Sequence, residues 1–275
     1  MSNYIVGFIG GGNMARALVG GLVASGYPHG NLLIAEPDAD RRARLAPRFP
    51  GVTITASNTG VARQADCLVL AVKPQVMRDV CLELSDIVQS RRPLVLSVAA
   101  GTHSRDIDRW LGGELAVVRV MPNQPALILK GASGLYANEL TTADQRDRAT
   151  EIVSAVGSVV HVADEASLDA VTAISGTGPA YFYLLIDALI HAAEEFGLEP
   201  QAAHKLVMDT AEGSAALAAI SGESMQDMIA HVRSPGGTTA AAFDVFDAEG
   251  VRAIFAAAFT AARDRAVELA ESSDA

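Results

Sequence analysis

Short, continuous apolar runs alternate with stretches of helical periodicity over the first half of the chain. The apolar runs lie at residues 4–9, 32–35, 67–72, 94–98, 116–121 and 159–162. Between the first two runs, Met14, Leu18 and Leu22 recur at helical spacing. Continuous apolar runs are typical of strands that are covered on both faces of a parallel sheet. The pattern therefore predicts a doubly wound α/β domain with a mostly parallel sheet.

The pattern changes near residue 163. Alanine-rich stretches with helical periodicity follow at residues 180–196, 201–220 and 249–271, and glycine turns interrupt them at 176–179 and 234–237. We therefore predict two domains, with the sheet in residues 1–163 and an all-α domain in residues 164–275.

Composition and charge exclude several classes of protein. Half of the 275 residues are hydrophobic, enough for a sizeable core, and the net charge is −11. A negative chain is a poor partner for nucleic acid or an anionic membrane surface, so we expect neither. The amino-terminal segment lacks a basic signal region, and no apolar run approaches the roughly 20 residues of a membrane span. The two cysteines have no disulfide or metal-site spacing, which favours a reducing, cytoplasmic location.

A glycine-rich turn connects the first predicted strand to the first predicted helix. Gly10, Gly12 and Ala15 have the GxGxxA spacing of a dinucleotide-binding Rossmann turn. Gly10 permits a tight turn, and Gly12 leaves room for a pyrophosphate beside the backbone. The amino terminus of the helix presents N–H groups and a positive dipole end to the phosphates. We therefore expect a nicotinamide dinucleotide to bind at this turn.

An acidic residue, Glu36, ends the second predicted strand, about 20 residues after the turn. A carboxylate at that place accepts hydrogen bonds from the ribose 2′-hydroxyl of NADH and repels the 2′-phosphate of NADPH. Arg41 and Arg42 follow closely and are candidates for binding that phosphate. The sequence therefore leaves the choice between NADH and NADPH open, with Glu36 favouring NADH.

Three loops follow predicted strands, where ligands of open α/β sheets bind. They are residues 71–75, 97–101 and 119–125. Lys73, one of three lysines, is a candidate base or phosphate ligand, or an ordinary surface lysine. Asn123 is a candidate ligand donor or a turn cap.

A second glycine turn, residues 234–239, precedes an alanine-rich helix. Successive N–H groups at a helix start bind an anion of carboxylate size, and the hydroxyl groups of Thr238 and Thr239 are additional donors. Simple amino-terminal capping by Ser or Thr is the alternative. The six histidines show no metal-ligand pairing, so we expect no metal; His231, three residues before the turn, is the histidine of interest.

Five segments together resemble the pyrroline-5-carboxylate reductase family. They are residues 8–15 (FIGGGNMA), 70–75 (LAVKPQ), 119–125 (RVMPNQP), 169–181 (DAVTAISGTGPAY) and 234–239 (SPGGTT), in family order. The resemblance implies a Rossmann domain followed by a helical dimerisation domain. It also implies a homodimer whose interleaved helices give each active site residues of the partner, and larger rings such as a homodecamer.

The resemblance also implies roles for individual residues. Thr239 would be the catalytic hydroxyl group that hydrogen-bonds the ring nitrogen of the substrate. Ser234 and the amides of Gly237, Thr238 and Thr239 would hold the substrate carboxylate, and His231, where the family often has Asn or Gln, joins this substrate-binding set. The cofactor-binding set would be Ile9, Gly10, Gly11, Gly12, Asn13, Met14, Glu36, Asn58, Ala71, Val72, Lys73, Pro74, Val98, Ala99 and Ala100.

The reaction that the resemblance implies is reduction of the C=N bond of 1-pyrroline-5-carboxylate by NADPH or NADH, the last step of proline synthesis. Two alternatives remain open. One is an oxidoreductase like the β-hydroxyacid dehydrogenases, whose catalytic lysine would have to be Lys205. The other is a non-catalytic dinucleotide-binding module. The sequence does not determine the oligomer size or any feedback regulation by proline.

Overall fold

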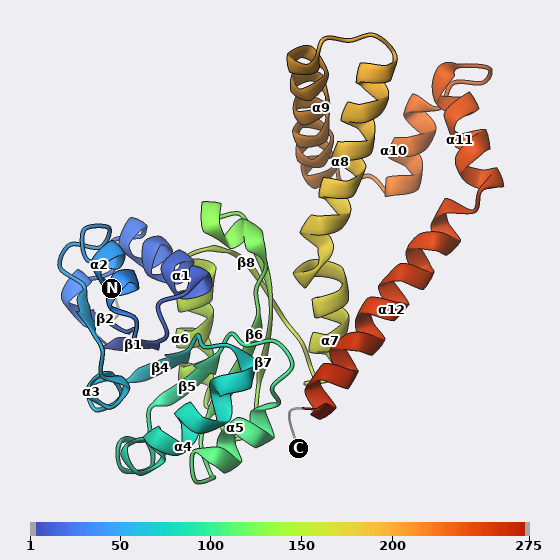
Figure 1. The fold of residues 1–275 in the computed structure, drawn as a ribbon. Coiled ribbons are helices and arrows are strands. Elements are labelled where there is room, and N and C mark those ends of the chain that lie inside the picture. Colours follow the sequence, from blue (N-terminus) through green and yellow to red (C-terminus); the bar gives the residue numbers. More distant parts are fainter. Residues whose placement is uncertain (1–3, 273–275) are drawn as a thin grey trace. The chain divides into compact units, whose positions relative to one another are not determined.

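The structure is a computed structural model that describes residues 4–272, and the described chain divides into two compact units (Figure 1). The sheet unit contains the residues up to Thr177 together with those from Ala262 onward. The helical unit contains Gly178–Ala261. The domain boundary expected after residue 163 remains a prediction.

The sheet unit is built on an eight-stranded sheet with the order β3-β2-β1-β4-β5-β6-β7-β8. Every pairing is parallel except the one between β6 and β7. The first six strands have the doubly wound order of a dinucleotide-binding fold, which confirms the predicted fold class. The strands are β1 Val6–Ile9, β2 Leu32–Ala35, β3 Thr53–Thr55, β4 Cys67–Leu70, β5 Leu94–Ser97, β6 Val117–Met121, β7 Gly131–Ala137 and β8 Gly157–His161.

Helices cover both faces of this sheet, and each face has its own core cluster. Phe8 and Leu96 belong to a cluster with Leu18 and Leu22 of α1 and Ile152 of α6. The opposite cluster joins the other strand faces to α3, α4 and α5. Continuous apolar strands result, as the pattern predicted, because both faces are buried. The helices are α1 Asn13–Ala24, α2 Ala39–Leu45, α3 Asn58–Ala62, α4 Pro74–Arg91, α5 Ser104–Trp110, α6 Ala143–Ser154 and α7 Ser167–Val171.

Two strands were not predicted. The strand β3 is short, polar and half exposed at the sheet edge, and β7 is rich in glycine, alanine and serine. Neither has a run of large apolar residues, which is the signal that reveals a buried strand. Gly134 of β7 is nevertheless required, because an added Cβ would lie 2.8 Å from a side-chain methyl of Val171. Tertiary packing, and not side-chain bulk, makes β7 a strand.

The helical unit contains α8 Gly178–Glu195, α9 Pro200–Ser221, α10 Met225–Val232, α11 Thr238–Ala248 and the beginning of α12 Val251–Ser272. These bounds confirm the three long helices that were expected from periodicity. Many large apolar side chains of this unit are exposed, including Phe182 at 67%, Leu184 at 68% and Ile220 at 82%.

One stretch of this region bears on the expectation that no apolar run is long enough to span a membrane. The stretch Ser167–Glu195 is long and apolar enough to cross a membrane by length and composition, and only 11% of its apolar window is buried. Glycine, serine and threonine interrupt the run without adding charge, so its mean hydropathy stays high although no single uninterrupted apolar run is long. An exposed apolar helix surface of this kind is typical of a site that another protein surface or a membrane covers.

Candidate active site

The glycine turn after β1 packs closely against the β4–α4 loop and against α2. Gly10 has φ +96°, and a Cβ there would lie 2.7 Å from the carbonyl oxygen of Ala71. A Cβ on Gly11 would lie 2.7 Å from Cδ1 of Leu45. Gly10 is therefore required where the turn packs against the β4–α4 loop, whereas at Gly11 the turn packs against a side chain of α2 that can shift.

Gly12 is different, because a Cβ there would meet no described atom within 4 Å. It is the N-cap of α1, and within the described residues no side chain caps that end. The first N–H groups of the helix therefore face open space. This space is part of a pocket of about 490 Å³, whose lining residues are Gly11, Gly12, Asn13, Arg16, Arg41, Arg44, Leu45, Arg48 and Lys73. Its open backbone and its cations fit the diphosphate of a dinucleotide.

Glu36 lies behind the turn, only 2% exposed. The N–H of Gly11 donates to its Oε2 at 3.0 Å, and the N–H of Asp38 donates to its Oε1 at 3.0 Å. Arg42 donates to the carbonyl oxygens of Glu36 and Pro37, both at 2.7 Å. Arg41 and Arg42 were both named from the sequence as candidates for binding the 2′-phosphate. Arg41 lines the pocket, whereas the guanidinium group of Arg42 is held by backbone carbonyl groups.

The loops after β4 and β5 lie at a second pocket, of about 400 Å³. Pro74 and Ala100, both expected to bind cofactor, line it, whereas Ala99 is buried and its N–H donates to Oγ of Ser97 at 3.3 Å. The loop after β4 therefore borders both pockets, because Lys73 lines the first and Pro74 the second. Asn58 lines neither of these pockets; its side-chain amide donates to Oε2 of Glu83 at 3.0 Å. The second pocket is lined by Pro74, Gln75, Arg78, Ala100, Gly101, Trp110, Asp169, Thr172, Ala266 and Leu269.

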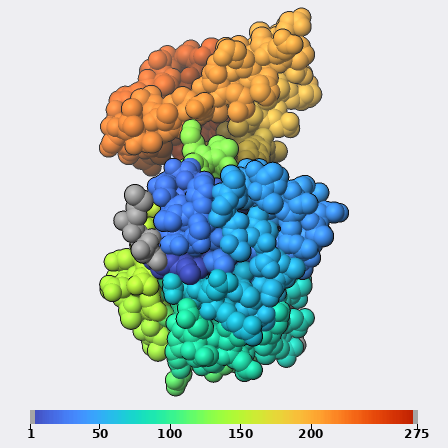
Figure 2. Space-filling model, turned by 90° about the vertical axis from the view of Figure 1, so that its left-hand side faces the viewer, coloured from blue at the N-terminus to red at the C-terminus, as the bar shows by residue number. Residues whose placement is uncertain are grey.

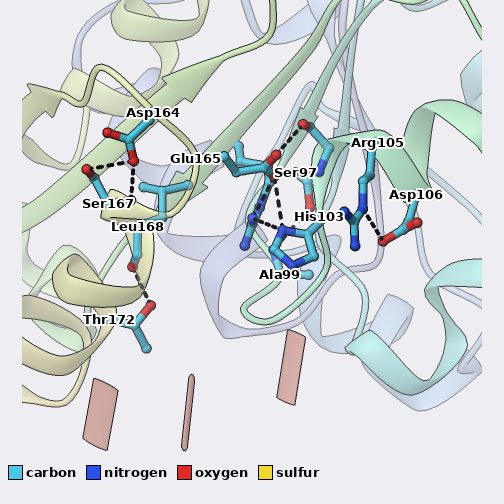
Figure 3. A network of polar contacts seen from close by, with 12 residues as sticks. Ser97, Ala99, His103, Arg105, Asp106, Asp164, Glu165, Ser167, Leu168 and Thr172 are labelled. Carbon is cyan, nitrogen blue, oxygen red and sulfur yellow. Dashed lines mark hydrogen bonds and ion pairs between the residues drawn. The ribbon is translucent and has the colours of Figure 1, made fainter. Parts of the chain in front are cut away.

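A buried polar network that sequence reasoning missed adjoins the β5–α5 loop (Figure 3). Oε1 of Glu165 accepts hydrogen bonds from Arg119 Nη1 at 2.6 Å and from the N–H of Ser104 at 2.5 Å, and it lies 3.7 Å from Nδ1 of His103. The hydroxyl group of Ser104 donates to Oε2 of Glu165 at 2.7 Å. Burial by itself would raise the pKa of Glu165, but the bonds from His103, Ser104 and Arg119 together lower it to about 2.

This network predicts a pH dependence of stability. The pKa of Glu165 is lower in the folded chain than its ordinary value of 4.5, so the ionised group stabilises the fold above that value. The contribution disappears as the pH falls from about 4.5 towards 2. We expect Glu165→Gln to lower the urea midpoint at neutral pH and to flatten its decline over this window. The exposed Glu139→Gln is the control, and a decline as steep in Glu165→Gln as in the parent would contradict the assignment.

Asn123 has a structural role in the sheet unit. Its side-chain amide donates to the carbonyl oxygen of Ser175 at 3.2 Å, and its Oδ1 accepts the N–H of Ala132 at 3.0 Å. Ser175 belongs to a π-helical turn, Thr172–Gly176. Asn123 therefore connects the loop after β6 to β7 and to this turn.

The second glycine turn lies in the helical unit. Gly236 has φ +70°, and the N–H of Gly237 donates to the carbonyl oxygen of Ser234 at 2.9 Å. Gly237 is the N-cap of α11, and no side chain in the described part of the chain caps that helix. Capping by Ser or Thr, the alternative reading of the sequence, is therefore absent there. Thr238 and Thr239 form the first turn of α11, where backbone N–H groups lack intrahelical partners.

Two side chains with ion-pair partners, Arg233 and His231, flank this turn. Arg233, which sequence reasoning did not single out, lies 3.0 Å from Asp244 and 3.5 Å from Asp247, and its guanidinium carbon lies 5.3 Å from the ring centroid of Phe243. Through these contacts Arg233 holds the residue before the turn against the side chains of α11. His231 is 69% exposed in its side chain and pairs with Glu223 at 3.0 Å.

The structure thus gathers most of the expected cofactor residues around the first glycine turn and the β4 and β5 loops of the sheet unit. The expected substrate residues belong to the helical unit, where Ser234, Gly237, Thr238 and Thr239 form one turn. The described residues contain no group of three or more His, Cys, Asp or Glu side chains able to hold a metal ion.

Comparisons with known proteins agree on one family. The family model for the pyrroline-5-carboxylate reductase dimerisation region matches residues 165–269, and a model described as "NADP oxidoreductase coenzyme F420-dependent" matches residues 5–101. A curated pyrroline-5-carboxylate reductase of Pseudomonas aeruginosa is 44% identical over 271 residues, covering 98% of each chain.

Two solved structures give the same result. A pyrroline-5-carboxylate reductase of Coxiella burnetii is 40% identical with a TM-score of 0.92, covering 98% of this chain and 99% of that one. The pyrroline carboxylate reductase of Plasmodium falciparum, solved with NADP bound, is 28% identical with a TM-score of 0.87, covering 98% and 99%.

Proposed function

The chain belongs to the pyrroline-5-carboxylate reductase family, and we propose that its two glycine turns form the two halves of the active site. The protein is an oxidoreductase that reduces 1-pyrroline-5-carboxylate to L-proline with NADPH or NADH, the last step of proline synthesis. The observation that carries the proposal is the second turn, an uncapped helix start with two adjacent glycines.

The first turn and the loops that adjoin it hold the cofactor. The open space at Gly12 receives the diphosphate, and the α1 amide groups together with Arg16 and Lys73 neutralise its charge. The other predicted cofactor residues, from Ile9, Met14 and Asn58 to Val98, Ala99 and Ala100, keep their roles as proposals. When bound, the cofactor supplies the hydride for the imine carbon.

The second turn holds the substrate. The amides of Gly237, Thr238 and Thr239, with Ser234, bind the carboxylate at the positive end of α11. The hydroxyl oxygen of Thr239 accepts a hydrogen bond from the N–H of the protonated ring nitrogen, and so orients the imine. A protonated imine is the better electrophile, so Thr239 favours the reactive form by binding it. His231, paired with Glu223, lies beside the turn and stays in the proposed substrate-binding set.

The family membership and the dimerisation region imply that the protein forms an oligomer and acts on a small molecule. We propose that a second copy covers the exposed apolar side chains of α8 and α9 and contributes to a shared active site, in a homodimer or in larger rings of dimers. Burial in such an interface accounts for the apolar stretch Ser167–Glu195 without a membrane. We also propose that the chain divides into its two domains after residue 163. We further propose that the protein is cytoplasmic and that it has no nucleic-acid partner.

The experiment that tests the function is an absorbance assay of NADPH and NADH oxidation with pyrroline-5-carboxylate, repeated with 3-oxo acids, the keto acids that correspond to β-hydroxyacids, as substrates. We expect oxidation with the imine alone. Turnover of the keto acids alone would support the dehydrogenase alternative, for which Lys205, exposed and paired with Asp209 at 2.7 Å, is the required lysine. No turnover with any substrate would support a dinucleotide-binding module.

A further inference from the structure

The loop between β5 and α5, residues 98–103, is fastened at both of its ends. At the first end, the N–H of Val98 donates to the carbonyl oxygen of Leu70, the last residue of β4, at 3.1 Å. At the second end, Ser104 donates twice to Glu165, from its backbone N–H at 2.5 Å and from its hydroxyl group at 2.7 Å. Ser104 and Glu165 are 61 positions apart in the chain, so this second attachment is a tertiary contact.

Glu165 is itself held in place by basic side chains. Arg119 of β6 pairs in the sheet with Ser97, the last residue of β5, and its Nη1 donates to Oε1 of Glu165 at 2.6 Å (Figure 3). Nδ1 of His103 lies 3.7 Å from the same oxygen. The side chains of Arg119 and Glu165 are only 6% and 18% exposed, and a carboxylate so far from water needs such a partner. Because both of its oxygens are engaged, the carboxylate of Glu165 has a fixed orientation.

The two segments that this contact joins line the same pocket. Ala100 of the β5–α5 loop and Asp169 of α7 both belong to the lining of the second pocket, of about 400 Å³. Glu165 precedes the first residue of α7 by two positions. The bonds between Ser104 and Glu165 therefore determine how far the loop lies from α7, and with it the width of the pocket.

From this geometry, and resting on the proposed function in that the nicotinamide end of the cofactor lies against the β5–α5 loop, we propose that Glu165 is a positioning residue for hydride transfer. Through Ser104 it keeps Ala100 at the wall of the second pocket, and this wall orients the nicotinamide ring towards the imine. Glu165 touches neither cofactor nor substrate in this role. A displacement of roughly 1 Å between reacting groups can slow a reaction by about 100-fold, so a loosened wall has a large effect.

The first test needs no cofactor. Hydrogen exchange of the β5–α5 loop is measured by mass spectrometry on the cofactor-free chain. We expect exchange to be at least about 10-fold faster in Glu165→Gln and about 3-fold faster in Ser104→Ala, because the loop opens locally when its second end is released or weakened. Ser104→Ala keeps the pair of Glu165 with Arg119, so it tests the attachment even if Glu165→Gln does not fold. Parental exchange in Ser104→Ala and in a folded Glu165→Gln would overturn the proposal.

The second test is the rate of hydride transfer from NADPH to pyrroline-5-carboxylate in a single turnover. We expect a rate about 10-fold lower or less in Glu165→Gln, with KM for the imine within about 2-fold of the parent, because the substrate residues are untouched. The double variant Glu165→Gln/Ser104→Ala should be little slower than Glu165→Gln, because both changes release the same contact. Independent, additive losses, or a parental rate in variants with a loosened loop, would overturn the proposal.

Thr142→Ala is the matched control. The hydroxyl group of Thr142 accepts the N–H of Gln145 at 3.2 Å at the start of α6, so this variant also loses a hydroxyl group that fixes the start of a helix. The core clusters place α6 and α5 on opposite faces of the sheet, and Figure 2 shows the yellow-green segments around residue 150 at the surface, beside the blue amino-terminal ones. We expect a lower urea midpoint with parental loop exchange and hydride transfer. A loss of hydride transfer as large as in Ser104→Ala would attribute both losses to stability and overturn the proposal.

The parent chain separates this inference from the proposed function. If the parent reduces the imine and a folded Glu165→Gln reduces it at the parental rate, the inference fails and the function stands. If the parent does not reduce the imine, the proposed function fails, and the inference that rests on it fails as well, whatever the exchange of the loop.

Discussion

Replacing Thr239 with alanine is expected to lower kcat/KM for pyrroline-5-carboxylate by about 10- to 100-fold, because a hydrogen bond to a charged group contributes roughly 1.5–3 kcal/mol. Thr239 lies in the first turn of α11, so the substitution leaves the backbone N–H groups of the carboxylate site in place. Binding of NADPH, which the sheet unit is proposed to hold, should remain unchanged. Kinetics with varied imine concentration measures the loss.

Thr239→Ser is the matched control, because it keeps the hydroxyl group and removes only a methyl group. We expect it to retain most of the activity that the alanine variant loses. A parental kcat/KM in Thr239→Ala would refute the role of Thr239, and an equal loss in both variants would indicate that the methyl group, by packing, was the important part.

The second large effect is expected for Phe182→Asp, which should convert the oligomer into monomers and abolish imine reduction. Phe182 of α8 is 67% exposed and lines a groove of about 370 Å³, together with residues such as Leu185 and Leu189 of α8 and Thr210 of α9. If a second copy covers this groove, the change removes roughly 1.5–3 kcal/mol of apolar burial per side chain and buries an unpaired charge. A two-fold interface contains the substitution on both sides.

Size-exclusion chromatography with light scattering measures the mass, and the same fractions are assayed for activity. Leu82→Asp is the control, since Leu82 is an apolar side chain of α4 in the sheet unit and is 53% exposed. We expect this control to remain oligomeric and active. An oligomeric Phe182→Asp would place the interface elsewhere, and active monomers would refute the shared active site.

Much of the fold could be predicted because local signals and tertiary environment agreed. The runs at residues 67–72 and 94–98 are buried on both faces, so apolar content alone revealed β4 and β5. The strand β7 escaped prediction because its glycine and alanine residues carry no strand signal, although they are needed where Val171 approaches. Glu165 also escaped prediction, since its partners Ser104 and Arg119 are distant in the sequence.

The sequence by itself predicted a dinucleotide turn and a second glycine turn before a helix, because glycine spacing before a helix is a local property of the chain. Only the tertiary structure decided which charged groups reach the pocket. In the sequence, Glu36 favours NADH. In the structure its side chain is buried, and each of its oxygens accepts a hydrogen bond from a backbone N–H. Arg42 donates to the backbone, while Arg44 and Arg48 join Arg41 at the pocket. Availability of a side chain depends on burial and on hydrogen-bond partners brought together by folding, which spacing along the chain does not specify.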